Sequence, residues 1–153
     1  MKNVIRGIAR GAATIIAAVS ALAVPGVAHA DGPIPEPYIA GCPDSGYPVP
    51  GNPSQSCTSM TNGALFHGKH HPDSTRTRIY SQYKKTSGSA ITARLGYNYA
   101  GTNHWGDWFT QSAGTTKTKD WYTYDYDFWC NNTVGLLNVS GQGTFQTPIS
   151  RCA

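Results

Sequence analysis

The sequence predicts an all-β fold: an antiparallel β-sandwich or barrel-like domain of about seven short strands held by two disulfides. Three observations lead to this prediction. After residue 30 the chain has a single Glu, little Leu and many Thr, Ser, Tyr and Gly, a composition that suits strands and turns better than helices. Short segments rich in β-branched and aromatic residues alternate with Gly- and Asn-rich turns. Four cysteines follow an N-terminus that reads as an export signal, which indicates a disulfide-held domain.

Residues 1–30 have the pattern of a secretory signal peptide. The segment begins with basic residues, continues as an apolar run and ends in the small-residue sequence AHA at 28–30, where a signal peptidase would cleave. Cleavage after Ala30 removes three basic residues and lowers the formal net charge from +4 to about +1. We therefore expect a secreted protein, extracellular or cell-wall associated, with no nucleic-acid partner and no membrane insertion of the mature chain.

The cysteines are expected to form two disulfides. Three pairings of Cys42, Cys57, Cys130 and Cys152 are possible, and we favour Cys42–Cys57 with Cys130–Cys152 because both close short loops. Zinc binding is the alternative, but the spacing has no C-x-x-C and an oxidising compartment disfavours free thiolates. We expect no metal site and no cofactor.

The mature chain divides into an irregular segment and one domain. Residues 31–56 are rich in Pro and Gly and show no periodicity, so we expect an irregular N-terminal segment. The β-sandwich domain is expected over residues 57–153. Its predicted strands are 62–67, 77–84, 89–99, 105–111, 117–129, 133–140 and 143–147.

The clearest strand lies within residues 89–99. Apolar or aromatic residues alternate there with polar residues and glycine. Successive side chains of a strand point to opposite faces, so one row is expected to face a core and the other to face water. The predicted inward row is Ile91, Ala93, Leu95, Tyr97 and Tyr99.

The sequence WYTYDYDFWC at 121–130 is the most unusual stretch. If residues 118–130 are extended, the even-numbered row is expected to face the core, since it comprises Tyr122, Tyr124, Tyr126, Phe128 and Cys130. The odd-numbered row would face outward and would place two indoles beside two carboxylates. Indoles stack on the C–H faces of sugars, and carboxylates accept hydrogen bonds from hydroxyls. The predicted binding residues are Trp121, Asp125, Asp127 and Trp129 of this row, together with Trp108. The alternative is structural: Trp121 and Trp129 would lie roughly 26 Å apart on an unbroken strand, and each would pack under a loop at its own strand end.

Other chemistries of the two carboxylates have less support. Asp125 and Asp127 could form the acid–base pair of a glycosidase, but no Glu lies nearby and no other feature indicates a cleft. They could bind calcium together with Asn131 and Asn132, but the segment matches no calcium-loop signature.

The remaining candidates for catalysis or metal binding are also weak. His67, His70 and His71 lie close together with Asp73 beyond them, but we interpret FHGKHHPD as a solvated polar loop. The chain contains no G-x-S-x-G, phosphate-binding loop or dinucleotide fingerprint. We therefore predict a non-enzyme with no catalytic residues.

Two resemblances add to these inferences. The runs LGYNYAGTNHWGDWFTQSAGTTKTKDW and VGLLNVSGQGTFQTP, with the final Cys152, resemble uncharacterised small secreted β-rich proteins of high-GC Gram-positive bacteria. The resemblance covers residues 57–152 and implies a secreted β-rich domain, but it transfers no functional residue. The sequences LFHG, IYSQY and YDYDFW are similar to lactococcin-972-type bacteriocins, which are small secreted β-sandwich proteins.

The sequence thus favours a secreted, non-enzymatic β-sandwich protein that binds an extracellular partner. Cell-wall glycan, another polysaccharide and a protein are the candidate partners. One alternative is a bacteriocin-like antimicrobial or toxin protein. Another is a small inhibitor of extracellular proteases, in which the disulfide-held loop 43–56 would enter the target.

Overall fold

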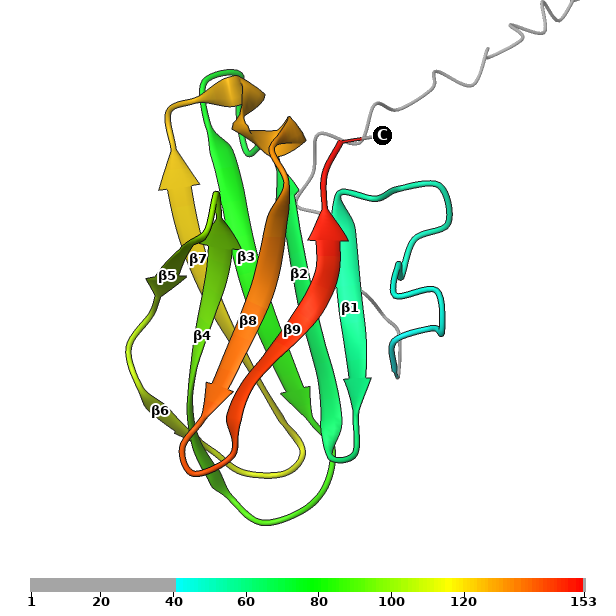
Figure 1. The fold of residues 1–153 in the computed structure, drawn as a ribbon, viewed down its shortest axis with the longest axis vertical. Coiled ribbons are helices and arrows are strands. Elements are labelled where there is room, and N and C mark those ends of the chain that lie inside the picture. Colours follow the sequence, from blue (N-terminus) through cyan, green and yellow to red (C-terminus); the bar gives the residue numbers. More distant parts are fainter. Residues whose placement is uncertain (1–40, 153) are drawn as a thin grey trace, which may run out of the picture.

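The computed structural model describes residues 41–152, which form nine β-strands in two antiparallel sheets and no α-helix (Figure 1). The strands are β1 (Gln55–Met60), β2 (Gly63–His70), β3 (Thr77–Lys85), β4 (Ile91–Tyr99), β5 (Thr102–Trp105), β6 (Phe109–Gln111), β7 (Thr115–Thr123), β8 (Thr133–Val139) and β9 (Gly143–Ser150). A short 3-10 helix, η1 (Tyr126–Cys130), connects β7 to β8. The predicted all-β class is confirmed. The predicted signal peptide, and the irregular segment up to residue 40, lie outside the described residues.

The two sheets pack face to face as a β-sandwich. The first sheet has the strand order β1-β2-β3-β7, and the second has the order β5-β4-β8-β9 with β6 also paired to β4. The structure has nine strands rather than about seven, for two reasons. Gln55 and Ser56, assigned to the irregular segment, begin strand β1, and the predicted strand 105–111 is divided into β5 and β6 by residues 106–108.

The inward row of β4 builds the core, as its alternation predicted. Ala93 and Leu95 are buried in the main cluster, and Ile91 packs at its edge. The other buried members of this cluster are Leu65, Tyr83, Leu137 and Val139. Tyr97 and Tyr99 continue the same row into a second cluster, which contains Ile79 and Phe128. Non-polar area from both sheets is thereby removed from water, which is the main stabilising contribution in a sandwich of this kind.

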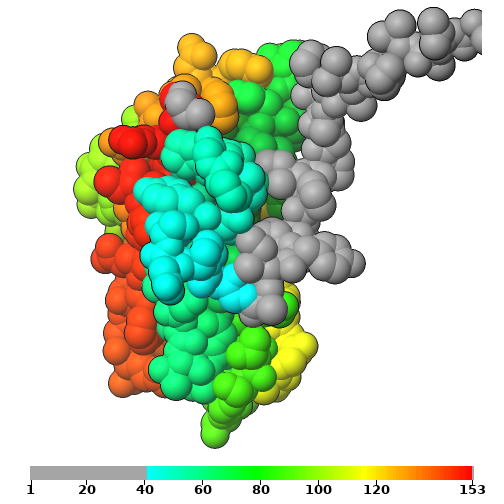
Figure 2. All heavy atoms as spheres, turned by 90° about the vertical axis from the view of Figure 1, so that its right-hand side faces the viewer, coloured from blue at the N-terminus to red at the C-terminus, as the bar shows by residue number. Residues whose placement is uncertain are grey.

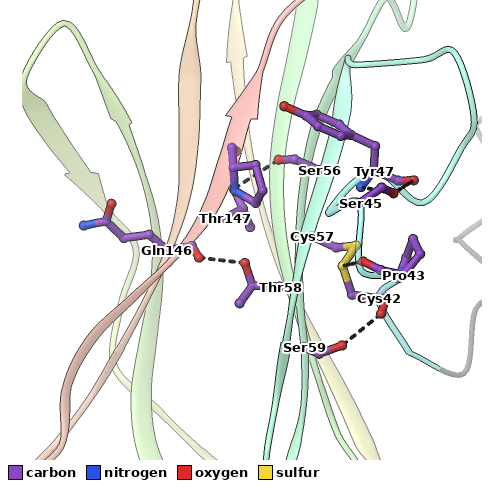
Figure 3. The surroundings of a disulfide bond; sticks show 11 residues. Cys42, Pro43, Ser45, Tyr47, Ser56, Cys57, Thr58, Ser59, Gln146 and Thr147 are labelled. Carbon is purple, nitrogen blue, oxygen red and sulfur yellow. Dashed lines mark hydrogen bonds between the residues drawn. A yellow bond between two sulfur atoms is a disulfide. The ribbon is translucent and has the colours of Figure 1, made fainter.

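The seam between β1 and β9 joins the two sheets through hydroxyl groups (Figure 3). Ser56 donates a hydrogen bond to the Thr147 hydroxyl (3.0 Å), and Thr58 donates to the Gln146 carbonyl (2.8 Å). Farther along, the Ser150 hydroxyl donates to the carbonyl of Ser54 (2.6 Å). The backbone and hydroxyl groups at this edge are thus satisfied by the opposite sheet, as buried polar groups require.

The disulfides pair Cys42 with Cys57 and Cys130 with Cys152, which confirms the predicted pairing. The first holds residues 42–56 against the β1–β9 seam, where Tyr47 donates a hydrogen bond to the Ile149 carbonyl (3.2 Å). In Figure 2 this segment, in cyan, lies beside the red β9. The second ties the end of η1 to the end of the described chain.

The predicted strand 117–129 is wrong beyond Thr123. The register of β7 with β3 pairs Thr123 with Thr77, and Thr77 is the first residue of β3. Later residues therefore have no neighbouring strand with which to pair. The backbone leaves the sheet and forms η1, with the Asn131 amide donating to the Phe128 carbonyl (2.9 Å).

The two rows of β7 also face opposite ways from the prediction. Trp121 lies directly across from Ile79, and paired residues of neighbouring strands share a face of the sheet. Since Ile79 is buried in the sandwich, Trp121 points inward and Tyr122 points outward. The inward row also contains Lys117 and Lys119, at the open edge of the sheet. Because lysine usually faces water, these residues made the inward row look like the outward one.

Residues 66–70 of the predicted polar loop FHGKHHPD are instead the second half of β2, and the polar side chains of His67 and Lys69 are fully buried. His67 Nδ1 donates to the Tyr80 carbonyl (2.7 Å), and its Nε2 accepts a hydrogen bond from the Thr133 hydroxyl (2.8 Å). Lys69 donates to the carbonyls of Asn131 and Ser150. Burial lowers the pKa of Lys69 to about 8. Both side chains reach partners in or beside the second sheet, so they connect the two layers.

Candidate binding surface

One end of the sandwich collects exposed aromatic side chains. It is built from the end of β7, from η1 and from the loop between β2 and β3, which lie together at the top of Figure 1. We call this surface the aromatic end and define it as His71, Arg76, Tyr122, Tyr124, Asp125, Tyr126, Asp127 and Trp129. It lies where β7 has passed the start of β3, so its side chains project beyond the sheet.

Three tyrosines dominate the surface. Tyr122 is 55% exposed, Tyr124 is 84% exposed and Tyr126 is 45% exposed. Large apolar rings favour burial, so three neighbouring tyrosines open to water form an exposed patch of the kind that marks interaction sites. Their hydroxyl groups add donors and acceptors to the apolar ring faces.

Hydrogen bonds hold the tyrosine segment in place. The buried Thr77 hydroxyl donates to the carbonyls of Asp125 and Tyr126, at 2.9 Å to each. The backbone amide of Asp125 also donates to the Thr123 hydroxyl (3.2 Å). These contacts fix the path of the chain between β7 and η1, and a fixed path reduces the entropy lost when a ligand binds.

Ring stacking fixes the neighbouring side chains. The rings of His71 and Tyr126 are nearly parallel, with centroids 3.6 Å apart and an interplanar angle of 6°. Trp129 meets His71 at 5.3 Å with an angle of 60°. A hydrogen bond between His71 Nδ1 and the Arg76 carbonyl (3.2 Å) connects this stack to the β2–β3 loop. Trp129 is thereby half-buried at the base of the surface.

Arg76 carries the positive charge of the surface. It pairs with Asp73 through its Nε (2.7 Å), and its guanidinium lies 5.6 Å from the centroid of the Tyr122 ring. The hydrogen bond from Arg76, together with two from Thr75, holds the pKa of Asp73 well below its usual range. Asp73 therefore stays ionised and keeps the β2–β3 loop in a fixed turn.

Two carboxylates at the aromatic end are free to accept hydrogen bonds from a ligand. Asp125 and Asp127 are exposed, and neither forms an ion pair with any residue of 41–152. Asp127 lies in the first turn of η1. The surface therefore combines apolar ring faces, free acceptors and one guanidinium within a single loop cluster.

The structure separates the five binding residues predicted from the sequence. Asp125, Asp127 and Trp129 come together at the aromatic end. Trp121 instead points into the sandwich and packs edge-on against Tyr97, with ring centroids 5.0 Å apart.

Trp108 lies on another face. The outer side of the second sheet carries a stack in which the Arg94 guanidinium lies 4.4 Å from the Trp105 ring and 4.8 Å from the Trp108 ring. Trp108 is 48% exposed at the end of this stack. It is therefore a separate aromatic site rather than a part of the aromatic end.

The sequence prediction missed the three tyrosines as surface residues, and it did not include His71 or Arg76 in the binding surface. One feature of the sequence could have indicated the orientation of Tyr122. Lys117 and Lys119 lie on the same row of β7 as Trp121. A strict alternation that puts two lysines and one indole inward would have put Tyr122 outward.

Within residues 41–152, no group of three or more His, Cys, Asp or Glu side chains is arranged to hold a metal ion. The same residues include no helix with the length and apolar character needed to cross a membrane. Comparison with protein-family models, with curated proteins and with solved structures gave no match. The two sequence resemblances therefore stay predictions.

Proposed function

We propose that the protein is a secreted, non-enzymatic β-sandwich whose aromatic end binds an extracellular polysaccharide. The observation that carries this proposal is the group of three exposed tyrosines, held in place beside two unpaired carboxylates. Sugar rings present apolar C–H faces that stack on aromatic rings. Their hydroxyls donate to carboxylates such as Asp125 and Asp127. The aromatic end offers both kinds of contact within one cluster.

The disulfides support the part of the proposal that concerns location. Two disulfides in a small domain are typical of extracellular proteins, because the cytosol keeps thiols reduced. The signal-peptide pattern of residues 1–30 agrees with export. A polysaccharide of the cell wall or its surroundings is thus a ligand that the protein would meet.

Replacement of Tyr124 by alanine tests the proposal with little risk to the fold. Tyr124 is 84% exposed, so we expect Tyr124→Ala to leave the Tm within ~2 °C of the wild type. We expect binding to purified cell-wall polysaccharide to weaken by about 10- to 30-fold, the usual loss when an aromatic anchor is truncated. Affinity electrophoresis or co-sedimentation measures both proteins side by side.

Trp108→Ala is the matched control, because it removes an exposed aromatic ring from a different face. It should leave polysaccharide binding unchanged. If Trp108→Ala abolishes binding and Tyr124→Ala does not, the ligand site is on the second sheet and the aromatic end is not the binding surface. If the wild type binds no polysaccharide, the ligand class is wrong.

A further inference from the structure

A cleft opens at the end of the sandwich opposite the aromatic end. It has a volume of about 450 Å³ and lies among the β1–β2 hairpin, the β8–β9 hairpin and the adjoining ends of β3 and β4. In Figure 1 these turns are at the bottom of the molecule, whereas η1 is at the top. The volume lies within the range of pockets that bind small molecules, roughly 300–1,000 Å³.

The walls of the cleft continue the hydrophobic core. Tyr83 and Val139 belong to the main buried cluster and also line the cleft. Met60, Ile91 and Phe145 line it as well, and each is only partly buried. Burial raises the pKa of Tyr83. The site therefore favours an apolar body.

Lys85 is the single charged residue among those that line the cleft. Its side chain is 1% exposed, and its ammonium donates to the carbonyl of Ser87. Within residues 41–152 it forms no ion pair with a carboxylate. A buried ammonium without a counter-charge is unfavourable, and an anion brought beside it would restore the balance.

The rim is polar but carries no charge. It is formed by side chains that offer hydrogen bonds, among them Thr61, Asn62 and Gln142. The cleft thus combines apolar walls, one cation and no acidic residue. Charge complementarity therefore points to a ligand with one negative group, because the lining contains no carboxylate that would repel it.

We propose that this cleft binds a small monocarboxylate with an apolar body, such as a medium-chain fatty acid. The carboxylate would replace the Ser87 carbonyl as the partner of Lys85, and the chain would lie against Met60, Ile91 and Phe145. This site is independent of the aromatic end. Loss of polysaccharide binding would leave it intact.

Titration with octanoate, followed through the methyl signals of Met60 and Ile91 by NMR, tests the inference. We expect saturable shifts for octanoate and about tenfold weaker binding of the uncharged octanol, since its hydroxyl accepts a weaker hydrogen bond from the ammonium than a carboxylate does. Lys85→Met should reduce octanoate binding to the level of octanol. Lys84→Met, which removes an equal charge outside the cleft, should leave octanoate binding unchanged.

A second variant tests the cleft independently, in case Lys85→Met does not fold. Gln142 is exposed in the β8–β9 turn, so Gln142→Trp should place an indole over the mouth of the cleft and abolish binding of both compounds. Saturable binding that Gln142→Trp does not affect would overturn the proposal. So would equal losses in Lys85→Met and Lys84→Met, octanol binding as tight as octanoate binding, or no shift at millimolar octanoate.

Discussion

Acidification from pH 7 to pH 3 is expected to lower the free energy of unfolding by on the order of 4 kcal/mol through His67. Burial lowers the pKa of His67 from 6.5 to about 3, and the positive charge of Lys69 lowers it too, whereas the hydrogen bond to the Tyr80 carbonyl raises it. Between these pKa values the unfolded chain binds a proton and the folded chain does not. The stabilisation is therefore complete above about pH 6.5 and is lost as the pH falls toward 3.

Urea unfolding at a series of pH values, followed by tryptophan fluorescence, measures this effect. His67→Gln removes the titrating ring, so the dependence of stability on pH between 3 and 6.5 should become much shallower. A residual dependence of the same sign is expected from Asp73 and His70, whose pKa values are also lowered. His71→Gln is the control because it removes a histidine outside the core. Equal pH dependence in His67→Gln and the wild type would show that His67 is not a buried neutral group.

Loss of the Cys130–Cys152 disulfide is expected to lower the free energy of unfolding by about 3 kcal/mol and the Tm by roughly 10 °C. The bond spans a sequence separation of 22, so it restricts the unfolded chain over the whole of β8 and β9. Cys130 is also the last residue of η1. The same variant, Cys130→Ala/Cys152→Ala, should therefore weaken polysaccharide binding at the aromatic end.

The other disulfide provides the comparison. Cys42→Ala/Cys57→Ala opens a loop of separation 15, for which the loop-closure argument also gives about 3 kcal/mol. This bond lies at the β1–β9 seam, so its loss should lower the Tm without changing ligand binding. Calorimetry and the binding assay together separate the two cases. A Tm within ~2 °C of the wild type for the Cys130/Cys152 variant would contradict the expected stabilisation.

The parts of the fold that the sequence predicted correctly are those whose pattern is local. In β4 the inward row is apolar throughout, because both of its flanks are covered by neighbouring strands. Alternation alone therefore gave its orientation. The disulfide pairing was also predictable, because both bonds close short loops.

The parts that were missed depend on contacts between distant segments. The burial of His67 was not predicted, because its partner, Thr133, is 66 residues away and belongs to the other sheet. Gly135 gives this ring its space, since a Cβ atom there would lie 2.3 Å from the His67 Cβ. Polar residues of this kind are stable inside a core only when distant partners satisfy them, so no local pattern indicates their burial.

Only part of the candidate surface was predicted, because its shape also depends on contacts between distant segments. Asp125, Asp127 and Trp129 were placed on a strand face, whereas they lie on and beside a 3-10 helix. The end of β7 is set by the first residue of β3, which local propensity does not reveal. An edge strand also tolerates lysine on its inward row, where the sandwich is open to water. Tyr122 therefore points outward, against the simplest interpretation of its apolar ring.

The most direct test of the central claim is an amide NMR titration with soluble peptidoglycan fragments as the ligand. The claim is that the exposed tyrosines and free carboxylates of the aromatic end recognise sugar. It predicts saturable shifts in residues 71–76 and 122–129, with the outer face of the second sheet unchanged. Shifts centred on Trp108 or on residues 43–53, or no shifts at millimolar ligand, would contradict it.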